Sequence, residues 1–201
     1  KGLPNLEKHI ENIGHFGEPP IVALNRFSAD SDAEIDVVRR RCEDMAIPFA
    51  VADHFAHGGA GTAELAQTVV SRAEPQRRRF RPLYNWSQSV PEKIREVARK
   101  MYGAADVVLT KQAEKDLAEI DKLGYGGLPV CIAKTQNSLS DDPKLRGRPR
   151  DFDVTVRNIQ VNAGAGFLVV LTGDILRMPG LPKQPRAEVI DVEGGEVKNL
   201  R

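Results

Sequence analysis

The chain has 201 residues, of which 41% are hydrophobic and 28% are charged, an ordinary composition for a globular protein. Its formal net charge is only +1, so no strong overall field favours a nucleic acid or a membrane surface as partner. No apolar stretch approaches membrane-spanning length, and the first residues hold no apolar signal-peptide core. We therefore expect neither a nucleic-acid partner nor a membrane partner.

The two cysteines, Cys42 and Cys131, lie far apart in the sequence, each inside an apolar stretch. This usage favours free thiols in a reducing cytoplasm over a disulfide framework. With four histidines and no Cys-x-x-Cys motif, we expect no structural zinc and assign no metal ligands.

The first hundred residues alternate predicted helices and strands. Apolar residues at helical spacing predict a helix over roughly residues 4–16. The apolar run at 20–25 is typical of a strand buried on both faces, and a second short strand follows at 49–52. This alternation predicts an α/β layer with a mostly parallel sheet.

Between these two strands, Ser31 and Glu34 form a capping-box pattern that predicts the start of a second helix. The predicted apolar face of this helix consists of Ile35, Val38, Cys42 and Met45. Asp30 and Asp32, which lie beside the cap, are expected to stabilise the helix N-terminus rather than to hold a metal.

A glycine-rich turn, Gly58-Gly59-Ala60-Gly61-Thr62, leads into a third predicted helix whose inward side chains would include Leu65 and Val69, with Thr62 a further candidate. Two interpretations of the turn stay open. Its amides and the helix dipole could bind an anion, or it could be a tight connector. It is not a P-loop, because the chain contains no Gly-x-x-x-x-Gly-Lys-Ser/Thr motif.

Residues 72–90 interrupt the alternation and predict a connector that leads to a helix over 91–102. The connector is rich in arginine, and a phosphate-binding or nucleic-acid-binding patch is one interpretation of that cluster. A solvated linker face is the interpretation that we prefer, because the net charge gives no support to the other. The arginines are Arg72, Arg77, Arg78, Arg79 and Arg81.

The second half predicts a smaller α+β unit with a mixed sheet. Strands are expected at 106–109, 129–133 and 167–171, the last two being continuous apolar runs, and a helix is expected at 111–123. Residues 152–161 alternate between apolar and polar, as a half-buried strand does, and 178–182 should be irregular. We place a domain boundary near residue 100, which divides the chain into 1–100 and 101–201.

A long polar loop, Lys134–Arg150, follows the predicted strand 129–133 directly. Its densest polar stretch, Lys134–Pro143, could contact a nucleotide or the tail of a substrate, or it could be a capped surface loop. The length of the loop favours a functional role, because long irregular segments in compact domains often carry function.

Two other loops each place an aromatic residue just past a predicted strand: Phe27 after the first and Phe55 after the second. In open parallel sheets, ligands bind at the carboxyl ends of the strands. Exposed aromatic rings are costly to hydrate, so two of them at one sheet edge predict a slot for a flat ring. His54 and His57 flank Phe55, and we interpret them as surface residues rather than as an acid–base pair.

At these loops the chain closely resembles the carboxyl-terminal portion of formate–tetrahydrofolate ligases. The resemblance covers the whole chain, and such long matching strings are very specific. The matching stretches are Gly2–Asn12, Val22–Phe27, Phe55–Gly59, Leu123–Gln136, Ser138–Pro143, Gly164–Phe167, Leu171–Ile175 and Met178–Pro182.

The resemblance implies an enzyme that joins formate to tetrahydrofolate with ATP and Mg²⁺, through formyl phosphate, to give 10-formyltetrahydrofolate, ADP and phosphate. It further implies a homotetramer stimulated by a monovalent cation, with the P-loop in an amino-terminal portion. That portion is absent from these residues, so we expect the chain to be a segment of a larger enzyme. We expect no catalytic residue in this segment.

The resemblance assigns the pterin ring to a sandwich between Phe27 and Phe55, with Val51 as an apolar wall and Ser28 beside the first ring. The family usually has Trp at Phe55, Pro at Ser28 and Lys at His57. For the polar loop, the resemblance suggests a place near the adenine or at a domain contact, with Gln136, Ser138 and Ser140 as the candidate residues. The alternative is a non-catalytic folate-binding or assembly module that partners a separate P-loop subunit.

Overall fold

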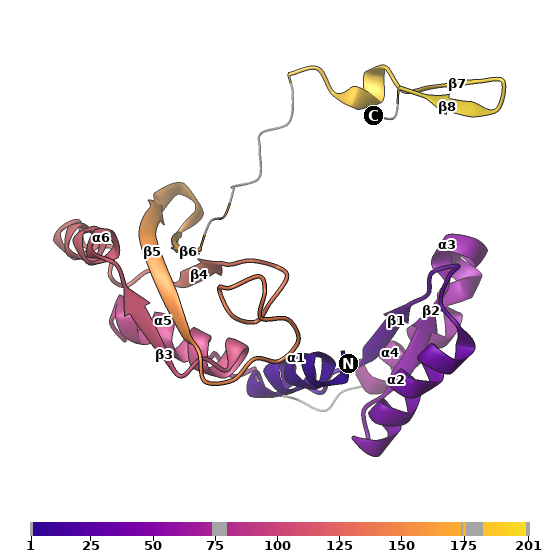
Figure 1. Cartoon of the computed structure of the whole chain (residues 1–201), viewed down its shortest axis with the longest axis horizontal. Coiled ribbons are helices and arrows are strands. Elements are labelled where there is room, and N and C mark those ends of the chain that lie inside the picture. The colour runs from indigo at the N-terminus through magenta and orange to yellow at the C-terminus, as the bar shows by residue number, and fades with distance from the viewer. Residues whose placement is uncertain (1, 74–79, 174, 176–182, 200–201) are drawn as a thin grey trace.

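The computed structural model describes residues 2–73, 80–173, 175 and 183–199. Within them the strands form a two-stranded parallel sheet, a four-stranded mixed sheet and a small antiparallel hairpin, in that order along the chain (Figure 1). This arrangement confirms the predicted α/β class, with parallel pairing in the first half and a mixed sheet in the second.

The first sheet pairs β1 (Val22–Asn25) with β2 (Phe49–Ala52) in parallel, so that Asn25 lies opposite Ala52. The predicted capping box of Ser31 and Glu34 is present. The helices of this part of the chain are α1 (Leu3–His15), α2 (Asp32–Asp44), the short α3 (His54–His57), the 3-10 helix η1 (Gly58–Thr62) and α4 (Ala63–Ala73).

Two burial predictions in this part of the chain are wrong. Strand β1 is not buried on both faces, because Ala23 and Asn25 are exposed. Val69 on α4 is 44% exposed rather than inward-facing. The cause is the small size of the layer: α2 and α4 both contact β2, which leaves β1 less covered.

The second sheet has the order β3-β5-β6-β4, with β5 antiparallel to β6 and the two outer strands parallel to their neighbours. A register shift between Val156 and Asn158 explains why the apolar alternation of the sequence changes phase there. The elements are α5 (Val90–Val97), the π-helical turn η2 (Ala98–Tyr102), β3 (Asp106–Leu109), α6 (Lys111–Lys122), β4 (Val130–Ala133), β5 (Asp153–Asn162), the 3-10 turn η3 (Ala163–Ala165) and β6 (Phe167–Thr172).

The main core lies between this sheet and helices α5 and α6. Its buried residues are Val90, Ile94, Ala113, Ile120, Val156, Ile159, Leu168 and Val170. Strand β4 differs from the prediction of a fully buried strand, because it is an edge strand of the sheet and its Cys131 is exposed. Cys42 is buried, and both thiols are free.

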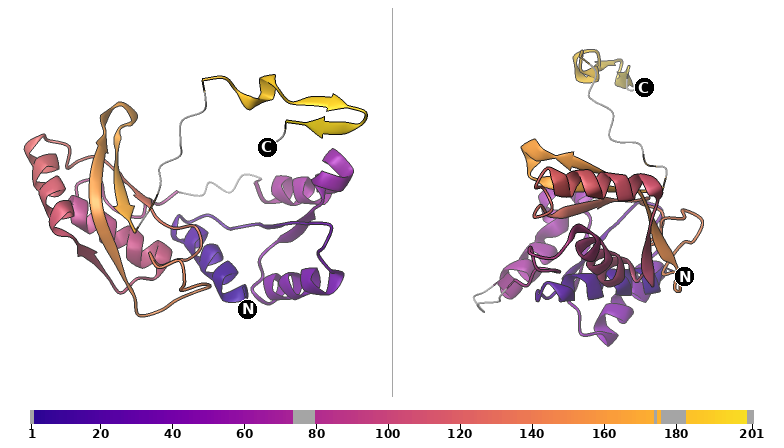
Figure 2. Two further views of the ribbon diagram at one scale, coloured as in Figure 1. Left: turned by 45° about the horizontal axis from the view of Figure 1, so that its top comes forward. Right: turned by 90° about the vertical axis from the view of Figure 1, so that its left-hand side faces the viewer.

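Helix α1 precedes the first sheet in the sequence but packs against the second unit (Figure 2). The Lys8 ammonium donates to the Lys100 carbonyl at 2.6 Å, and the Asn12 amide donates to the Met101 carbonyl at 2.8 Å. The Arg148 guanidinium donates to both Glu11 carboxylate oxygens, at 2.8 and 2.7 Å. The domain boundary near residue 100 stays a prediction.

The last described segment contains the 3-10 turn η4 (Arg186–Glu188) and a hairpin of β7 (Asp191–Glu193) and β8 (Glu196–Lys198). Both Figure 1 and Figure 2 show this hairpin standing apart from the rest of the ribbon. Residues 178–182, which we predicted to be irregular, lie outside the described residues. None of the described helices is long and apolar enough to cross a membrane.

Candidate functional site

The two aromatic loops both begin at the same edge of the first sheet. Because β1 and β2 are parallel and in register, Phe27 and Phe55 both lie just past the carboxyl ends of neighbouring strands. The backbone N–H of Arg26 donates to the Ala52 carbonyl at 3.0 Å, which extends the pairing to the start of the first loop. The Phe27 side chain is 65% exposed and that of Phe55 is 94% exposed, so both rings are available to a ligand.

Hydrogen bonds within the first loop fix the backbone at Phe27. Its N–H donates to the Asp30 carboxylate at 2.8 Å, and the Asp30 N–H donates to the Phe27 carbonyl at 3.0 Å. The Arg26 guanidinium pairs with Asp32 at 3.0 Å. Asp30 and Asp32 therefore shape the turn before α2. Ser28 is exposed beside Phe27, while Val51 is partly buried on β2.

The loop that carries Phe55 is fixed by a contact between two backbone segments. The Asp53 N–H donates to the Gly61 carbonyl at 2.9 Å. A Cβ atom on Gly61 would lie 2.1 Å from the Asp53 carbonyl oxygen, so only glycine fits there. These contacts favour the tight-connector interpretation of the glycine-rich turn. The exposed His57 ring lies 3.1 Å from the Asp53 carboxylate, which accounts for its orientation.

The polar loop after β4 is organised around Lys134. Its ammonium donates to the backbone carbonyls of Thr135, Ser138 and Ser140, and burial lowers the pKa of that ammonium. The Ser138 and Ser140 hydroxyls are buried, lie 2.9 Å apart and bond to the backbone of the loop. Of the three candidates in this loop, Gln136 alone is exposed.

Gln136 lines a hollow of about 400 Å³ between this loop and the start of α1. Residues that we did not single out also line it, among them His9 and Tyr102. Lys134 lies over the Tyr102 ring at 5.1 Å, and burial raises the pKa of the Tyr102 hydroxyl to about 12. The hollow can take a polar group, with the half-buried ring of Tyr102 as one wall.

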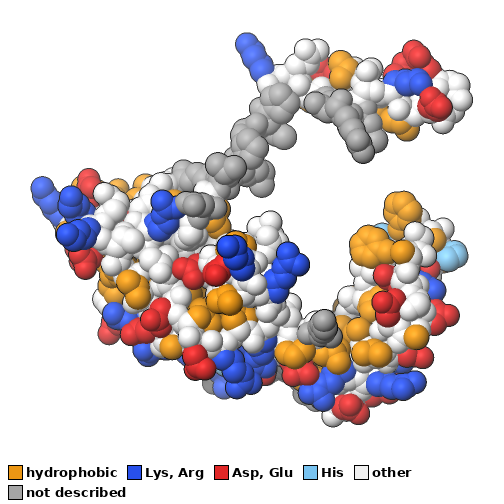
Figure 3. Space-filling model, in the orientation of Figure 1, with side chains coloured by type: hydrophobic (Ala, Val, Ile, Leu, Met, Phe, Trp, Pro, Cys, Tyr) orange, Lys and Arg blue, Asp and Glu red, His pale blue; other side chains and the backbone are white. Residues whose placement is uncertain are grey.

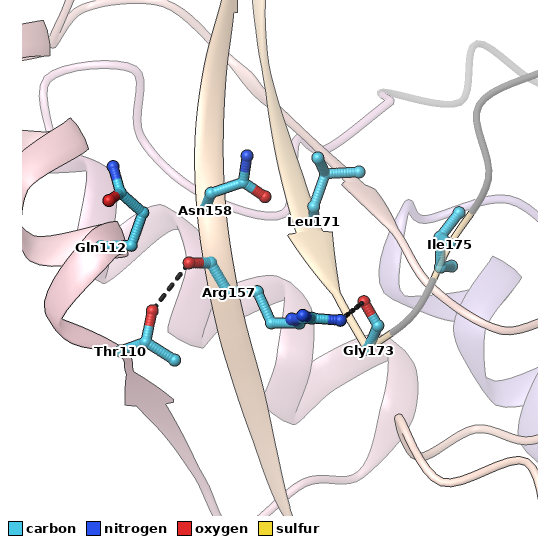
Figure 4. A pocket seen from close by; sticks show the side chains of 7 residues that line it. All are labelled: Thr110, Gln112, Arg157, Asn158, Leu171, Gly173 and Ile175. Carbon is cyan, nitrogen blue, oxygen red and sulfur yellow. Dashed lines mark hydrogen bonds between the residues drawn. The ribbon is translucent and has the colours of Figure 1, made fainter.

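A second hollow, of about 650 Å³, lies where β5, β6 and the start of α6 meet (Figure 4). The Thr110 hydroxyl donates to the Arg157 carbonyl at 2.7 Å, and the Arg157 guanidinium donates to the Gly173 carbonyl at 3.3 Å. Our reading of the sequence missed this hollow. The phase change of the alternation in β5 was the available signal, because Arg157 and Asn158 sit at that irregularity.

Magnesium needs oxygen ligands, usually carboxylates and phosphate oxygens. The described part of the chain contains no group of three or more His, Cys, Asp or Glu side chains that could hold a metal ion. The chain also contains no P-loop motif that could hold the phosphates of a nucleotide.

The geometry defines an α/β protein whose exposed aromatic pair stands at the carboxyl edge of a parallel sheet. A family model for formate–tetrahydrofolate ligase matches residues 1–201, the whole chain. The chain belongs to the formate–tetrahydrofolate ligase family, whose enzymes use ATP and tetrahydrofolate.

Proposed function

We propose that this chain supplies the pterin-binding side of a formate–tetrahydrofolate ligase. The observation that carries the proposal is the placement of Phe27 and Phe55, two exposed rings at the carboxyl ends of paired strands in a chain of this family. Val51 forms an apolar wall, and Ser28 lies next to the first ring. A pterin is flat and aromatic, so it gains stacking contact with both rings.

Held in this way, the folate amine is oriented toward formyl phosphate. Positioning two reactants removes an entropic part of the barrier, on the order of several kcal/mol. Phe55 offers less stacking area than the Trp that is usual in the family and has no indole N–H donor. We therefore expect weaker pterin binding than a Trp at this position would give.

The phosphate chemistry belongs, in this proposal, to a P-loop-bearing portion outside these 201 residues, together with Mg²⁺ and a stimulating monovalent cation. Gln136, with the loop shaped by Ser138 and Ser140, contacts the nucleotide or that portion. The complete enzyme is a homo-oligomer, proposed as a tetramer, in the cytoplasm. The alternative function is a non-catalytic folate-binding or assembly module that pairs with a separate P-loop subunit.

We call the pair of rings Phe27 and Phe55 the clamp. It is tested by Phe27→Ala and Phe55→Ala in the complete enzyme. Each variant should weaken tetrahydrofolate binding by roughly 1–3 kcal/mol, the range seen when a base loses an aromatic stacking partner. Isothermal titration calorimetry with tetrahydrofolate measures this loss. Phe80→Ala is the matched control, because Phe80 is 64% exposed but stacks on Phe16 outside the site. Unchanged affinity in both clamp variants would contradict the assignment of the pterin ring to these two residues.

The proposal that the phosphate chemistry lies outside these residues is tested with the purified 201-residue chain alone. We expect no formation of 10-formyltetrahydrofolate from ATP, formate and tetrahydrofolate, because no P-loop is present to hold the phosphates. The assay follows product absorbance and ADP release. Turnover by the chain alone would contradict the proposal, and activity restored by adding a separately expressed P-loop portion would favour the two-subunit alternative.

A further inference from the structure

The chain crosses twice between the first sheet and the rest of the molecule, and the two crossings touch each other. It leaves α1 at Phe16 on its way to β1, and after α4 it returns at Phe80. The Phe16 and Phe80 rings are stacked with their centroids 5.6 Å apart, and the Arg81 N–H donates to the Phe16 carbonyl at 2.9 Å. Residues 22–73, which carry the clamp, are therefore an insertion whose two connections lie side by side. We call residues 22–73 the clamp unit.

The clamp unit packs mainly on itself. Helices α2 and α4 lie on β2, and η1 contacts both β2 and α4. Among the described elements, no helix or strand of this unit packs closely on the mixed sheet. Figure 1 shows the two sheets in separate bodies with α1 between them, and the molecule narrows between these bodies in Figure 3. Relative motion is expected of two units that share no large apolar interface.

The first crossing contains a flexible joint followed by a stiff segment. Gly17 has a φ of 83°, in the left-handed region that glycine adopts without strain, and its N–H donates to the Gly14 carbonyl at 3.0 Å at the end of α1. Pro19 and Pro20 follow, and their rings fix the φ angles of the chain that leads to β1. Rotation is therefore concentrated at Gly17, next to the stacked rings.

Helix α1 is fixed to the other side of these crossings. Lys8 and Asn12 are buried, and both donate to carbonyls of η2. Glu11 accepts two hydrogen bonds from Arg148. We call α1 together with residues 80–173 the base. A bond from α1 to the clamp unit therefore bridges the two moving parts.

One ion pair forms such a bridge. The Nε of Arg41 on α2 donates to the Glu7 carboxylate on α1 at 2.7 Å. The side chains of Glu7 and Arg41 are 22% and 38% exposed, so the pair is partly shielded from solvent and from screening by salt. The other described ion pairs of the clamp unit lie within it: Arg26–Asp32, Arg39–Asp36 and His57–Asp53.

We propose that the clamp unit turns on a hinge at Phe16, Gly17 and Phe80, and that the Glu7–Arg41 pair is the latch that sets its angle on the base. Hinges of this kind are built from a few residues at the ends of elements. Because the clamp moves with its unit, Glu7 and Arg41 are positioning residues that aim the pterin without contacting it. This effect on the reaction rests on the proposed function, whereas the hinge and the latch rest on the geometry alone.

Distances between two spin labels in the full chain test the hinge and the latch. The labels are attached at Val37→Cys on α2 and Val108→Cys on β3, whose parent residues are 53% and 48% exposed. Cys131→Ser removes the exposed native thiol, and Cys42 is buried. With the latch intact we expect one narrow distance distribution by double electron–electron resonance. Glu7→Gln should broaden it, because the amide keeps the shape of the side chain but loses the ion pair.

A charge swap, a salt series and a matched control sharpen this test. Arg41→Gln should broaden the distribution as Glu7→Gln does, and Glu7→Arg combined with Arg41→Glu should narrow it again, because opposite charges then meet in exchanged positions. About 1 M salt should broaden the distribution of the wild-type latch and leave that of Glu7→Gln nearly unchanged. Glu96→Gln is the control and should change nothing, because its 2.6 Å pair with Lys100 lies within the base.

Kinetics of the complete enzyme separate the aim of the pterin from its binding. We expect Glu7→Gln to lower kcat about 3- to 10-fold, because the folate amine is then held less well against its partner. The Kd for tetrahydrofolate should change by less than about 2-fold, because the stacking contacts of the clamp are intact. The charge-swapped variant should recover most of kcat.

The hinge and latch would be overturned by a Glu7→Gln distribution that matches the wild type, by equal broadening in Glu96→Gln, or by a charge swap that fails to narrow the distribution. Circular dichroism of each variant checks that it is folded. Unchanged kcat in a variant with broadened distances would overturn the positioning role. Failure of the clamp assignment appears instead as unchanged tetrahydrofolate affinity in Phe27→Ala and Phe55→Ala, and it leaves the distance measurement unaffected.

Discussion

Gly61 shows how a single residue supports the sheet edge that carries Phe27 and Phe55, which we call the aromatic edge. A side chain there would meet the Asp53 carbonyl, and Asp53 immediately precedes the helix that carries Phe55. The turn between β2 and α4 can close only if the two backbone segments touch. The position of Phe55 therefore depends on a glycine six residues later in the chain.

We expect Gly61→Ala to lower the free energy of unfolding by about 1–3 kcal/mol, since overpacking forces the backbone apart. Urea denaturation measures this loss. Gly59→Ala is the control, because a Cβ there meets no atom within 4 Å, and it should change stability far less. Equal stability of the two variants would show that the contact between Asp53 and Gly61 is not closed in solution.

Lys93 joins two elements of the second unit. It is fully buried on α5, and its ammonium donates to the carbonyls of Gly126 at 3.0 Å and Leu128 at 3.1 Å. These carbonyls belong to the turn between α6 and β4. Burial lowers the pKa of the Lys93 ammonium below its ordinary value of 10.5. The charge is thus kept in the core to anchor a turn that forms no regular structure.

The lowered pKa gives a pH dependence with a definite sign. Between the folded-state pKa and 10.5, the unfolded chain binds more protons at Lys93 than the folded chain does, so stability rises with pH in that window. We expect the wild type to gain stability relative to Lys93→Met as the pH approaches 10.5, and to lose that gain as the pH falls. Thermal unfolding of both proteins across this range provides the measurement. Parallel curves would contradict the expectation.

Across the whole molecule, burial is concentrated in the mixed sheet. Val154, Val156 and Val170 are completely buried, whereas α4 has no buried residue and the C-terminal hairpin is exposed. Regions with few buried contacts open at low free-energy cost. The unit with the mixed sheet is therefore expected to be the most resistant to local opening. The first sheet with the aromatic edge, and the C-terminal hairpin, are less buried and should open more easily.

Hydrogen exchange followed by mass spectrometry should reproduce this order. At low protein concentration we expect the amides of β5 and β6 to exchange slowest and those of β7 and β8 fastest, with α4 between them. A hairpin as protected as β5 in dilute monomer would contradict this distribution.

Much of the fold could be read from local patterns, because helix periodicity and caps depend on nearby residues. The helix at α1, the cap at Ser31 and the strands β2 and β3 agree with the predictions. Burial could not be read in the same way. Ala23 and Cys131 lie in apolar runs yet are exposed, because a two-stranded layer and an edge strand leave one side uncovered.

The candidate site can be divided in the same way, into features that local sequence patterns predicted and features that depend on tertiary contacts. The sequence by itself determined the two aromatic loops and the family, because strand ends, turn residues and long matching strings are local features of the chain. The parallel pairing of β1 and β2 was predicted, but only the tertiary structure decided its register, in which Asn25 lies opposite Ala52. It also decided that Ser138 and Ser140 turn inward while Gln136 stays exposed. Such choices depend on which distant segments meet, and hydrogen bonds between those segments set them.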